Sequence, residues 1–410
     1  MSPLAGIRVL DLSRVLAGPW AGQLLADYGA DVIKVERPGS GDDTRGWGPP
    51  WWGEAAERMS AYYLCANRGK RSIAVDIASP EGAQLVRTLA AEADVLLENY
   101  KVGQLARYGL DAASLRALNP RLVYCSITGY GQTGPEASRA GYDFAIQAAG
   151  GLMSVTGEAE GTPHTQPQKV GVAVVDLMTG VYATTAILAA LQGRERTGQG
   201  CHIDTALLDV QVAMLANQAS NHLVGGVVPR RMGNAHPNIV PYQVFATADG
   251  HIVLAVGNDT QFAKLCELVG QIEVSRDVRF ATNAARVAHR AEVVGMVAQW
   301  MVAHSTSAWC ARLDAAGVPC APLRSIDQVF QSQQVLARGM LIKTGCGDDA
   351  AGSVPLVAAP VLFDGERAAA RRGPPTLDQH GSALRQAIAE RGGWPEATDD
   401  GDPTNDHSRR

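Results

Sequence analysis

The sequence predicts an α/β fold, with a doubly wound, Rossmann-like large domain beside a smaller α+β domain. The first observation is that short apolar runs alternate with helical stretches through residues 1–130. This alternation is typical of a mainly parallel sheet covered by helices on both faces. The second is a change after two long apolar helices, where Asp249-Gly250 separates two strand-like runs. Asp-Gly favours a tight hairpin turn, so we expect antiparallel strands there.

The large domain is expected to begin with a βαβ unit. Residues 7–12 are predicted to form a buried strand, 18–28 a helix and 32–35 a second strand, joined by a right-handed crossover. The alternation continues with strands at 72–76, 95–97 and 122–126, and helices at 79–92, 102–108, 178–191 and 206–223.

Four parts of the chain are expected. They are a large domain at 1–224, a small α+β domain at 225–325, a return segment at 326–392 that completes the large domain, and a tail at 393–410. The small domain has strand-like runs at 242–246 and 251–256, and helical stretches at 260–268, 290–303 and 307–315. The return segment contains a strand-like run at 354–363 and a helical stretch at 379–390. The tail is polar and has few large aliphatic residues, so we expect it to be disordered.

Composition excludes several classes of protein. The net charge is −5 and there is no long Lys/Arg run, which argues against a general nucleic-acid role. The seven cysteines show no C-x-x-C pair, which indicates reduced thiols in a cytoplasmic setting. No run of eighteen apolar residues predicts a membrane span. Charged residues interrupt the N-terminal apolar runs, so we expect no secretory signal.

The βαβ start also suggests a dinucleotide-binding domain, with Glu36 near the position of a ribose-binding acid. The turn between strand and helix does not fit this reading. It spans Arg14–Pro19 and contains one glycine, whereas close approach of a pyrophosphate requires G-x-G-x-x-G. A nicotinamide-dependent oxidoreductase is therefore disfavoured.

Asp176 is the candidate catalytic residue. It ends the apolar, strand-like run 170–175 and precedes a small-residue turn. A carboxylate in that place is expected to be partly desolvated, which destabilises the anion and suits a nucleophile. The alternative is that Asp176 is the N-cap of the helix expected at 178–191.

Several motifs together resemble family III CoA-transferases of the CaiB/BaiF type. They are Gly141-Tyr-Asp-Phe144, Gly150-Gly-Leu-Met153, the Asp176 segment, Arg196-Thr-Gly-Gln-Gly200, and the blocks 3–19, 31–37 and 67–72. Their order and spacing match that family over roughly residues 3–390. The resemblance implies an interlocked homodimer whose substrates are acyl-CoA and a carboxylic acid.

The same resemblance implies that Asp176 accepts the acyl group. A carboxylate that attacks a thioester gives a mixed anhydride, and the released thiolate then converts it into an aspartyl-CoA thioester. Neither a metal nor a permanently bound cofactor is expected, since CoA itself is the group transferred. Gly150 and Gly151 are expected to supply backbone N–H groups for the oxyanion, with an ordinary turn as the alternative.

A CoA site needs cations for its phosphates and apolar walls further in. We select Lys70, Arg71 and Arg107, supported by Arg37; the alternative is that each is a solvated surface residue. The resemblance adds residues that line the CoA channel or the first turn beside it, namely Val15, Ala17, Asn99, Tyr100 and Tyr108.

The acid substrate is expected to be a dicarboxylate. Arg14 lies in the first βα turn, and a guanidinium suits the carboxylate that does not react. His236 is a further candidate for this pocket, with a structural hydrogen bond as its alternative. The segments 41–50, 124–135 and 239–243 are especially similar to the succinyl-CoA:glutarate subgroup. Leu16 replaces the polar Gln of formyl-CoA:oxalate members, which disfavours oxalate.

Two other functions remain as alternatives. Racemases of 2-methylacyl-CoA in the same superfamily use the His of a Gly-His-Asp motif, which here reads Gly141-Tyr142-Asp143. A tyrosine with a pKa near about 10 is a poor substitute for an imidazole base, so Tyr142 is expected to contact substrate instead. A non-catalytic CoA-binding protein is disfavoured because Asp176 lies inside an intact set of motifs.

Overall fold

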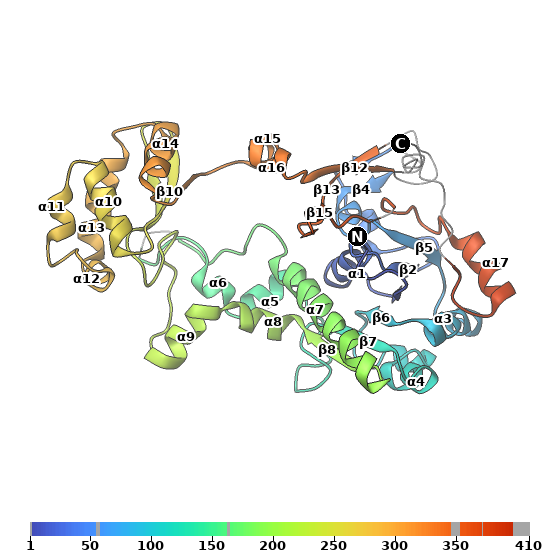
Figure 1. Cartoon of the computed structure of the whole chain (residues 1–410). Coiled ribbons are helices and arrows are strands. Elements are labelled where there is room, and N and C mark those ends of the chain that lie inside the picture. The colour runs from blue at the N-terminus through green and yellow to red at the C-terminus, as the bar shows by residue number, and fades with distance from the viewer. Residues whose placement is uncertain (1, 55–57, 162–164, 346–352, 371, 397–410) are drawn as a thin grey trace. The chain divides into compact units, whose positions relative to one another are not determined.

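The computed structural model describes residues 2–54, 58–161, 165–345, 353–370 and 372–396. The chain forms two compact units (Figure 1). The first comprises 1–151, 170–219 and 334–410, and the second comprises 152–169 and 220–333. The chain therefore leaves the first unit twice and returns to it after residue 333.

A six-stranded sheet forms the centre of the first unit, in the order β5-β2-β1-β6-β7-β8. Every neighbouring pair is parallel, as the βαβ alternation predicted. The strands are β1 Arg8–Asp11, β2 Asp31–Glu36, β5 Lys70–Ala74, β6 Val95–Glu98, β7 Val123–Thr128 and β8 His202–Ala206. The edge strand β8 was not predicted, because its sequence HIDTA contains no continuous apolar run.

Two hydrophobic cores cover the two faces of this sheet. One core contains residues of α3, α4 and α17, and the other contains residues of α1 and α7. The helices are α1 Ala17–Asp27, α3 Pro80–Glu92, α4 Ala112–Leu118, α5 Asp143–Ala149, α7 Val174–Thr197, α8 Leu207–Met214 and α17 Gly381–Arg391. Within the described ranges, α7 alone has the length and hydropathy of a membrane span, and its buried apolar side chains belong to the second core.

Three local predictions for this unit were wrong. The run 170–175 is not a strand, because α7 already begins at Val174. Of the helix expected at 102–108, one 3₁₀ turn forms, η2 Leu105–Tyr108. The helix expected at 206–223 is divided into α8 and α9 (Ala216–Gly225) at Ala216, whose φ is 43°. A positive φ cannot continue a right-handed helix.

The second unit contains a three-stranded antiparallel sheet in the order β11-β10-β9. The predicted hairpin is confirmed, since Ala246 pairs with His251 around the Asp-Gly turn. Its elements include α6 Leu152–Val155, β9 Tyr242–Ala246, β10 His251–Ala255, α10 Asp259–Leu268, α11 Ile272–Arg276, α12 Asn283–Ala288, α13 Arg290–Met301, α14 Thr306–Ala316, β11 Cys320–Pro322 and α15 Ile326–Gln331. A separate hydrophobic core is enclosed by these elements.

Short elements complete the first unit. They are η1 Asp43–Gly46, β3 Trp51–Trp52, β4 Met59–Ser60, α2 Ala61–Leu64, α16 Gln333–Ala337, β12 Leu341–Gly345, β13 Ser353–Val357, β14 Leu362–Phe363 and β15 Glu366–Arg367. The prediction of disorder from residue 393 onward was wrong at its start. Trp394 is buried and its indole Nε1 donates to Asp31 Oδ2 at 2.8 Å. The rest of the tail, 397–410, lies outside the described residues.

Candidate active site

Asp176 is the third residue of α7, and a carboxylate from another helix caps that helix. The residue before the helix, Ala173, provides no side-chain cap. Asp143, on α5, instead accepts hydrogen bonds from the backbone N–H groups of Val175 at 2.8 Å and Asp176 at 3.3 Å. The N-cap alternative for Asp176 is therefore wrong. The Asp176 carboxylate itself accepts no hydrogen bond from the described protein groups. It therefore has no structural hydrogen bond to lose when it reacts.

Asp143 is itself held by a buried glutamine. Gln147 lies one turn further along α5 and its Nε2 donates to Asp143 Oδ1 at 2.6 Å. The other end of the amide accepts from the Val170 backbone N–H at 2.9 Å. Gln147 is fully buried, so both amide ends are used where water cannot replace them. The pair fixes the start of α7, and with it the direction of Asp176.

The electrostatic setting of Asp176 is that of a reactive carboxylate. Burial, with a smaller contribution from the negative charge of Asp143, raises the pKa of Asp176 to about 7. Asp176 is half-buried, in agreement with the predicted partial desolvation. Tyr62 is close enough to be affected: burial, followed by the charge of Asp176, raises the pKa of Tyr62 to about 12. Because no cation among the described residues offsets these effects, the anion of Asp176 is high in free energy near neutral pH.

A cavity of about 250 Å³ opens beside Asp176, lined entirely by the first unit. The predicted site residues on its walls are Arg14, Val15, Ala17, Asn99, Tyr100, Tyr142 and Asp176. Sequence reasoning missed Asp43, Trp47 and Arg139, which also line it. Asp43 and Trp47 fall inside the segment 41–50, but nothing in that segment indicated which side chains would face a ligand.

Arg14 is fixed through its main chain in the turn between β1 and α1. The Asn99 side chain accepts from the Arg14 N–H at 2.9 Å and donates to the Arg14 carbonyl at 2.7 Å. The next residue, Val15, has a φ of 72°, a strained conformation for a β-branched residue. Its N–H donates to Asp42 Oδ1 at 3.1 Å. These contacts hold the turn that carries Arg14.

A model of CoA-transferase family III matches residues 4–381. The chain belongs to CoA-transferase family III. It is 51% identical over 390 residues to the succinate–glutarate CoA-transferase of Agrobacterium fabrum, with 95% of both chains covered. It is 43% identical to the human succinyl-CoA:glutarate CoA-transferase, over 95% of this chain and 86% of the human one. A solved structure of a CAIB/BAIF family protein from Brucella suis is 50% identical, with a TM-score of 0.81 over 94% of this chain and 99% of that one.

Two cations selected for CoA do other work in this CoA-transferase. Lys70 is fully buried and its Nζ pairs with Asp11 Oδ2 at 2.8 Å. Arg71 is buried too, and its Nε donates to Asp31 Oδ1 at 3.0 Å. Both predictions were wrong, because strand β5 points these side chains into internal ion pairs. The sequence could not distinguish an inward from an outward basic residue.

The other predicted CoA contacts lie at accessible positions or beside the cavity. Arg37 is exposed and lines a second cavity of about 70 Å³, together with Tyr100. Arg107, on η2, is also exposed. Tyr108, by contrast, packs against the hydrophobic core and is partly buried. Ala17 is buried at the start of α1 and lines the cavity beside Asp176.

The glycine pair does not offer its N–H groups to an oxyanion. The Gly150 N–H donates to the Ile146 carbonyl at 2.7 Å and the Gly151 N–H to the Ala148 carbonyl at 3.4 Å. Both groups therefore finish α5, and that prediction was wrong. Gly150 has a packing reason, since a Cβ would lie 2.3 Å from Gln211 Cγ. Gly151 adopts a φ of 86°, which favours glycine.

His236 belongs to the second unit. Its Nδ1 accepts from the Asn238 N–H at 3.1 Å, and its ring lies 5.2 Å from that of Tyr242. Its role toward substrate stays a prediction. Glu36, the acid of the dinucleotide alternative, is buried in an ion pair with Arg45 at 2.7 Å. Within the described ranges, no cluster of His, Cys, Asp or Glu is arranged to hold a metal.

Proposed function

We propose that this CoA-transferase moves CoA from succinyl-CoA to a free dicarboxylic acid, glutarate or a relative of four to six carbons. The observation that carries the proposal is one cavity that contains both an unpaired, half-buried carboxylate, Asp176, and a guanidinium, Arg14. The first group suits acyl transfer and the second suits the remote carboxylate of the acid. The names of the bacterial and human relatives support the same pair of substrates.

The proposed chemistry needs no group beyond Asp176 and the substrates. The Asp176 carboxylate attacks the thioester carbonyl, the C–S bond breaks, and a mixed anhydride and CoA thiolate form. The thiolate attacks the Asp176 carbonyl of the anhydride, which releases succinate and leaves an aspartyl-CoA thioester. The acceptor carboxylate repeats these steps in reverse and regenerates Asp176. Electrons and protons balance, since each step exchanges one acyl bond for another.

The raised pKa of Asp176 supports this role on energetic grounds. An anion stabilised by hydrogen bonds or a cation loses that stabilisation when it becomes a neutral ester-like group. Asp176 has no such partner among the described residues, and the pKa near 7 indicates a high-energy anion. Forming the neutral anhydride or thioester therefore relieves an unfavourable buried charge.

We propose that CoA lies along the turn between β1 and α1 and along the segment that follows β6, which both border the cavity. Val15, Ala17, Asn99 and Tyr100 line its walls, and the exposed Arg37 and Arg107 are the proposed phosphate contacts. The phenol of Tyr142 is 65% exposed at the cavity and is proposed to contact the acyl group. Gly150 and Gly151 are not part of the proposed oxyanion site, because their N–H groups are used within α5.

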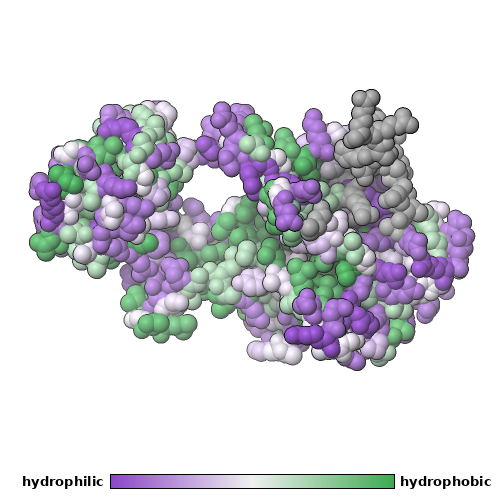
Figure 2. Space-filling view, in the orientation of Figure 1, coloured by the Kyte–Doolittle hydropathy of each residue, from purple (hydrophilic) through white to green (hydrophobic). Residues whose placement is uncertain are grey.

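We also propose that the enzyme is an interlocked homodimer. Large apolar side chains are exposed on α5, α7 and α8, among them Phe144, Tyr182 and Val212. Figure 2 shows apolar residues gathered at the surface around these helices. Monomeric soluble proteins seldom expose contiguous patches of this kind. Light scattering at micromolar concentration tests the proposal, and a monomer would contradict it.

The function is tested with a panel of free acids and succinyl-CoA. Dicarboxylates of four to six carbons should give acyl-CoA products, as measured by chromatography of the thioesters, and acetate and butyrate should be poor acceptors. A preference for acetate or butyrate would contradict the dicarboxylate assignment. A chiral 2-methylacyl-CoA in heavy water should show no α-deuteration at a rate near turnover. Rapid exchange would favour the racemase alternative.

A further inference from the structure

The guanidinium of Arg14 is already paired with a carboxylate of the protein. Arg14 Nη1 lies 2.9 Å from Asp43 Oδ2, and the two side chains are 43% and 46% exposed. Both residues line the cavity beside Asp176. Within the described ranges, Asp43 is the one hydrogen-bond acceptor of this guanidinium, and the Tyr100 ring lies 5.9 Å from its central carbon. The group proposed to bind a substrate carboxylate thus pairs with an internal one.

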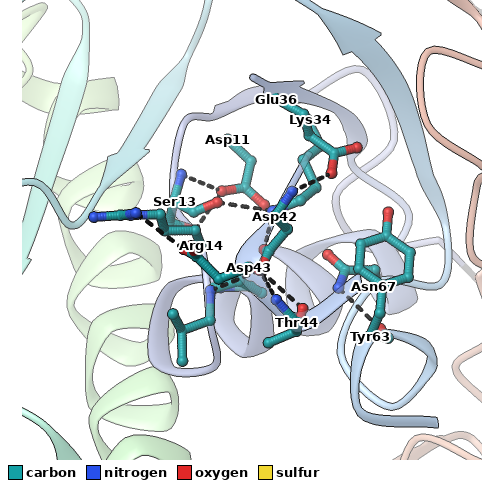
Figure 3. Close-up of polar contacts among 12 residues, drawn as sticks. Asp11, Ser13, Arg14, Lys34, Glu36, Asp42, Asp43, Thr44, Tyr63 and Asn67 are labelled. Atoms are coloured by element: carbon teal, nitrogen blue, oxygen red, sulfur yellow. Dashed lines mark hydrogen bonds and ion pairs between the residues drawn. The ribbon is translucent and has the colours of Figure 1, made fainter. Parts of the chain in front are cut away.

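The residues beside both ends of the pair are joined by a network of polar contacts, drawn in Figure 3. Asp42, next to Asp43, is buried and pairs with the Nζ of Lys34 at 2.9 Å. Asp42 Oδ1 also accepts from the backbone N–H groups of Val15 and Thr44, at 3.1 and 3.0 Å. The Lys34 Nζ donates in turn to the Ser13 carbonyl at 2.7 Å. One carboxylate therefore ties together the turn that carries Arg14 and the turn that carries Asp43.

The Lys34–Asp42 and Arg14–Asp43 ion pairs differ in burial, and this difference determines which of them a substrate carboxylate can displace. The buried Lys34–Asp42 pair cannot open without leaving a charge in the protein interior. The Arg14–Asp43 pair is half exposed, so water can solvate both groups and the pair contributes little to stability. A substrate carboxylate can therefore take the place of Asp43 on Arg14.

We propose that Asp43 is a stand-in for the remote carboxylate of the acid substrate. This inference rests on the proposed function. Asp43 neutralises Arg14 and yields it to an acid that carries a second carboxylate. An acid with one carboxylate has nothing to exchange at this position, so it gains nothing from Arg14. Asp43 thereby competes with the remote carboxylate for Arg14 and limits the preference for dicarboxylates.

The test measures kcat/KM for glutarate and for butyrate in Asp43→Asn, Arg14→Met and the double variant. Asp43→Asn keeps the shape but removes the competing charge, so the glutarate-to-butyrate ratio should rise by about 2- to 5-fold, mainly through KM. In the Arg14→Met background the same substitution should leave the ratio unchanged, because the contested cation is gone. Glu195→Gln is the matched control. It removes another exposed, ion-paired carboxylate, 3.3 Å from Arg121, and should not change the ratio.

Three outcomes would overturn the inference. The first is a fall in the ratio in Asp43→Asn, which would mean that Asp43 orients Arg14 for substrate. The second is an equal rise for both acids, which would reflect general charge. The third is an equal rise of the glutarate-to-butyrate ratio when Asp43→Asn is introduced into the Arg14→Met variant, which would mean that Asp43 does not act through Arg14. Thermal unfolding of each variant shows that the fold is retained. Failure of the proposed function looks different, because then the unmodified enzyme itself would not prefer dicarboxylates.

Discussion

Two aspartates of the first unit show how one side chain serves opposite purposes. Asp42 precedes η1 and lines the smaller cavity, whereas Asp176 lies in α7 and lines the larger one; both are at least partly withdrawn from solvent. Burial opposes ionisation of Asp42, but the Lys34 ammonium and hydrogen bonds from Thr44 lower its pKa to about 2. Burial and the charge of Asp143 raise the pKa of Asp176 to about 7. Burial alone therefore does not define a role, and the presence or absence of a counter-charge does.

The largest effect is expected from Asp176 itself. Asp176→Ala should reduce CoA transfer by at least about 10³-fold, because no other described carboxylate can take over covalent catalysis. Circular dichroism should show an unchanged fold. Substantial residual transfer in this variant would remove Asp176 from the mechanism.

The stability of Asp176→Asn has a definite pH dependence. The folded-state pKa of about 7 lies above the 3.8 of an unperturbed aspartate, so the folded protein binds the proton more tightly. The unmodified protein therefore loses stability as pH rises from about 4 to about 7. Asp176→Asn should be more stable than the unmodified protein at pH 8, by on the order of 2 kcal/mol, with little difference at pH 4. Urea unfolding at the two pH values measures this, and an equal difference at both would contradict the assigned pKa.

Lys34→Met should remove the cation that stabilises the Asp42 carboxylate. It leaves the carboxylate buried without its cation, and the free energy of unfolding should fall by about 3–5 kcal/mol. Arg121→Met is the matched control, since the Arg121–Glu195 pair is exposed and should contribute at most about 1 kcal/mol. Denaturant unfolding of both variants gives the comparison. Similar losses in the two would show that the buried pair is not special.

Arg14→Met tests the substrate side of the cavity. A charged hydrogen bond contributes about 1.5–3 kcal/mol, so kcat/KM for dicarboxylates should fall by roughly 10- to 100-fold. Monocarboxylates should be much less affected, because they do not use the guanidinium. Steady-state kinetics with both classes decides. An equal loss for both would mean that Arg14 supports the turn and does not select the acid.

Asp143→Asn is expected to have the smallest effect. The amide oxygen can still accept from the start of α7, but the negative charge that helps to raise the pKa of Asp176 is lost. The acid limb of the pH profile of kcat/KM should therefore move to lower pH. An acid limb that stays in place would indicate that burial alone accounts for the raised pKa.

The sequence predicted the pattern of the first unit better than the partners of its side chains. Strands and helices followed from apolar periodicity, and the hydrophobic setting of Asp176 followed from its neighbours. The strand β8 was missed because its residues alternate at a sheet edge. Lys70 and Arg71 were taken for ligand contacts, yet both face inward. Their orientation depends on strand pairing and on Asp11 and Asp31, which lie far from them in the sequence.

The contacts that define the candidate site are also long-range. Asp143 caps a helix that begins 31 residues later, and Asp43 pairs with Arg14 across 29 residues. Trp394 packs against a core built from the first half of the chain. Local sequence patterns do not indicate which residues far apart in the sequence will contact each other. They can locate a reactive residue such as Asp176 by its apolar neighbours. They cannot identify the distant residues that contact it or its surroundings, such as Asp143 and Asp43.

The central claim is that Asp176 becomes covalently acylated. The most direct test is to incubate the enzyme with succinyl-CoA and hydroxylamine, then map the modified peptide by mass spectrometry. Hydroxylamine should cleave the anhydride or thioester and leave a hydroxamate at Asp176, with none in enzyme incubated without succinyl-CoA. Unmodified Asp176 under conditions of active turnover, or a hydroxamate on another carboxylate, would contradict the account.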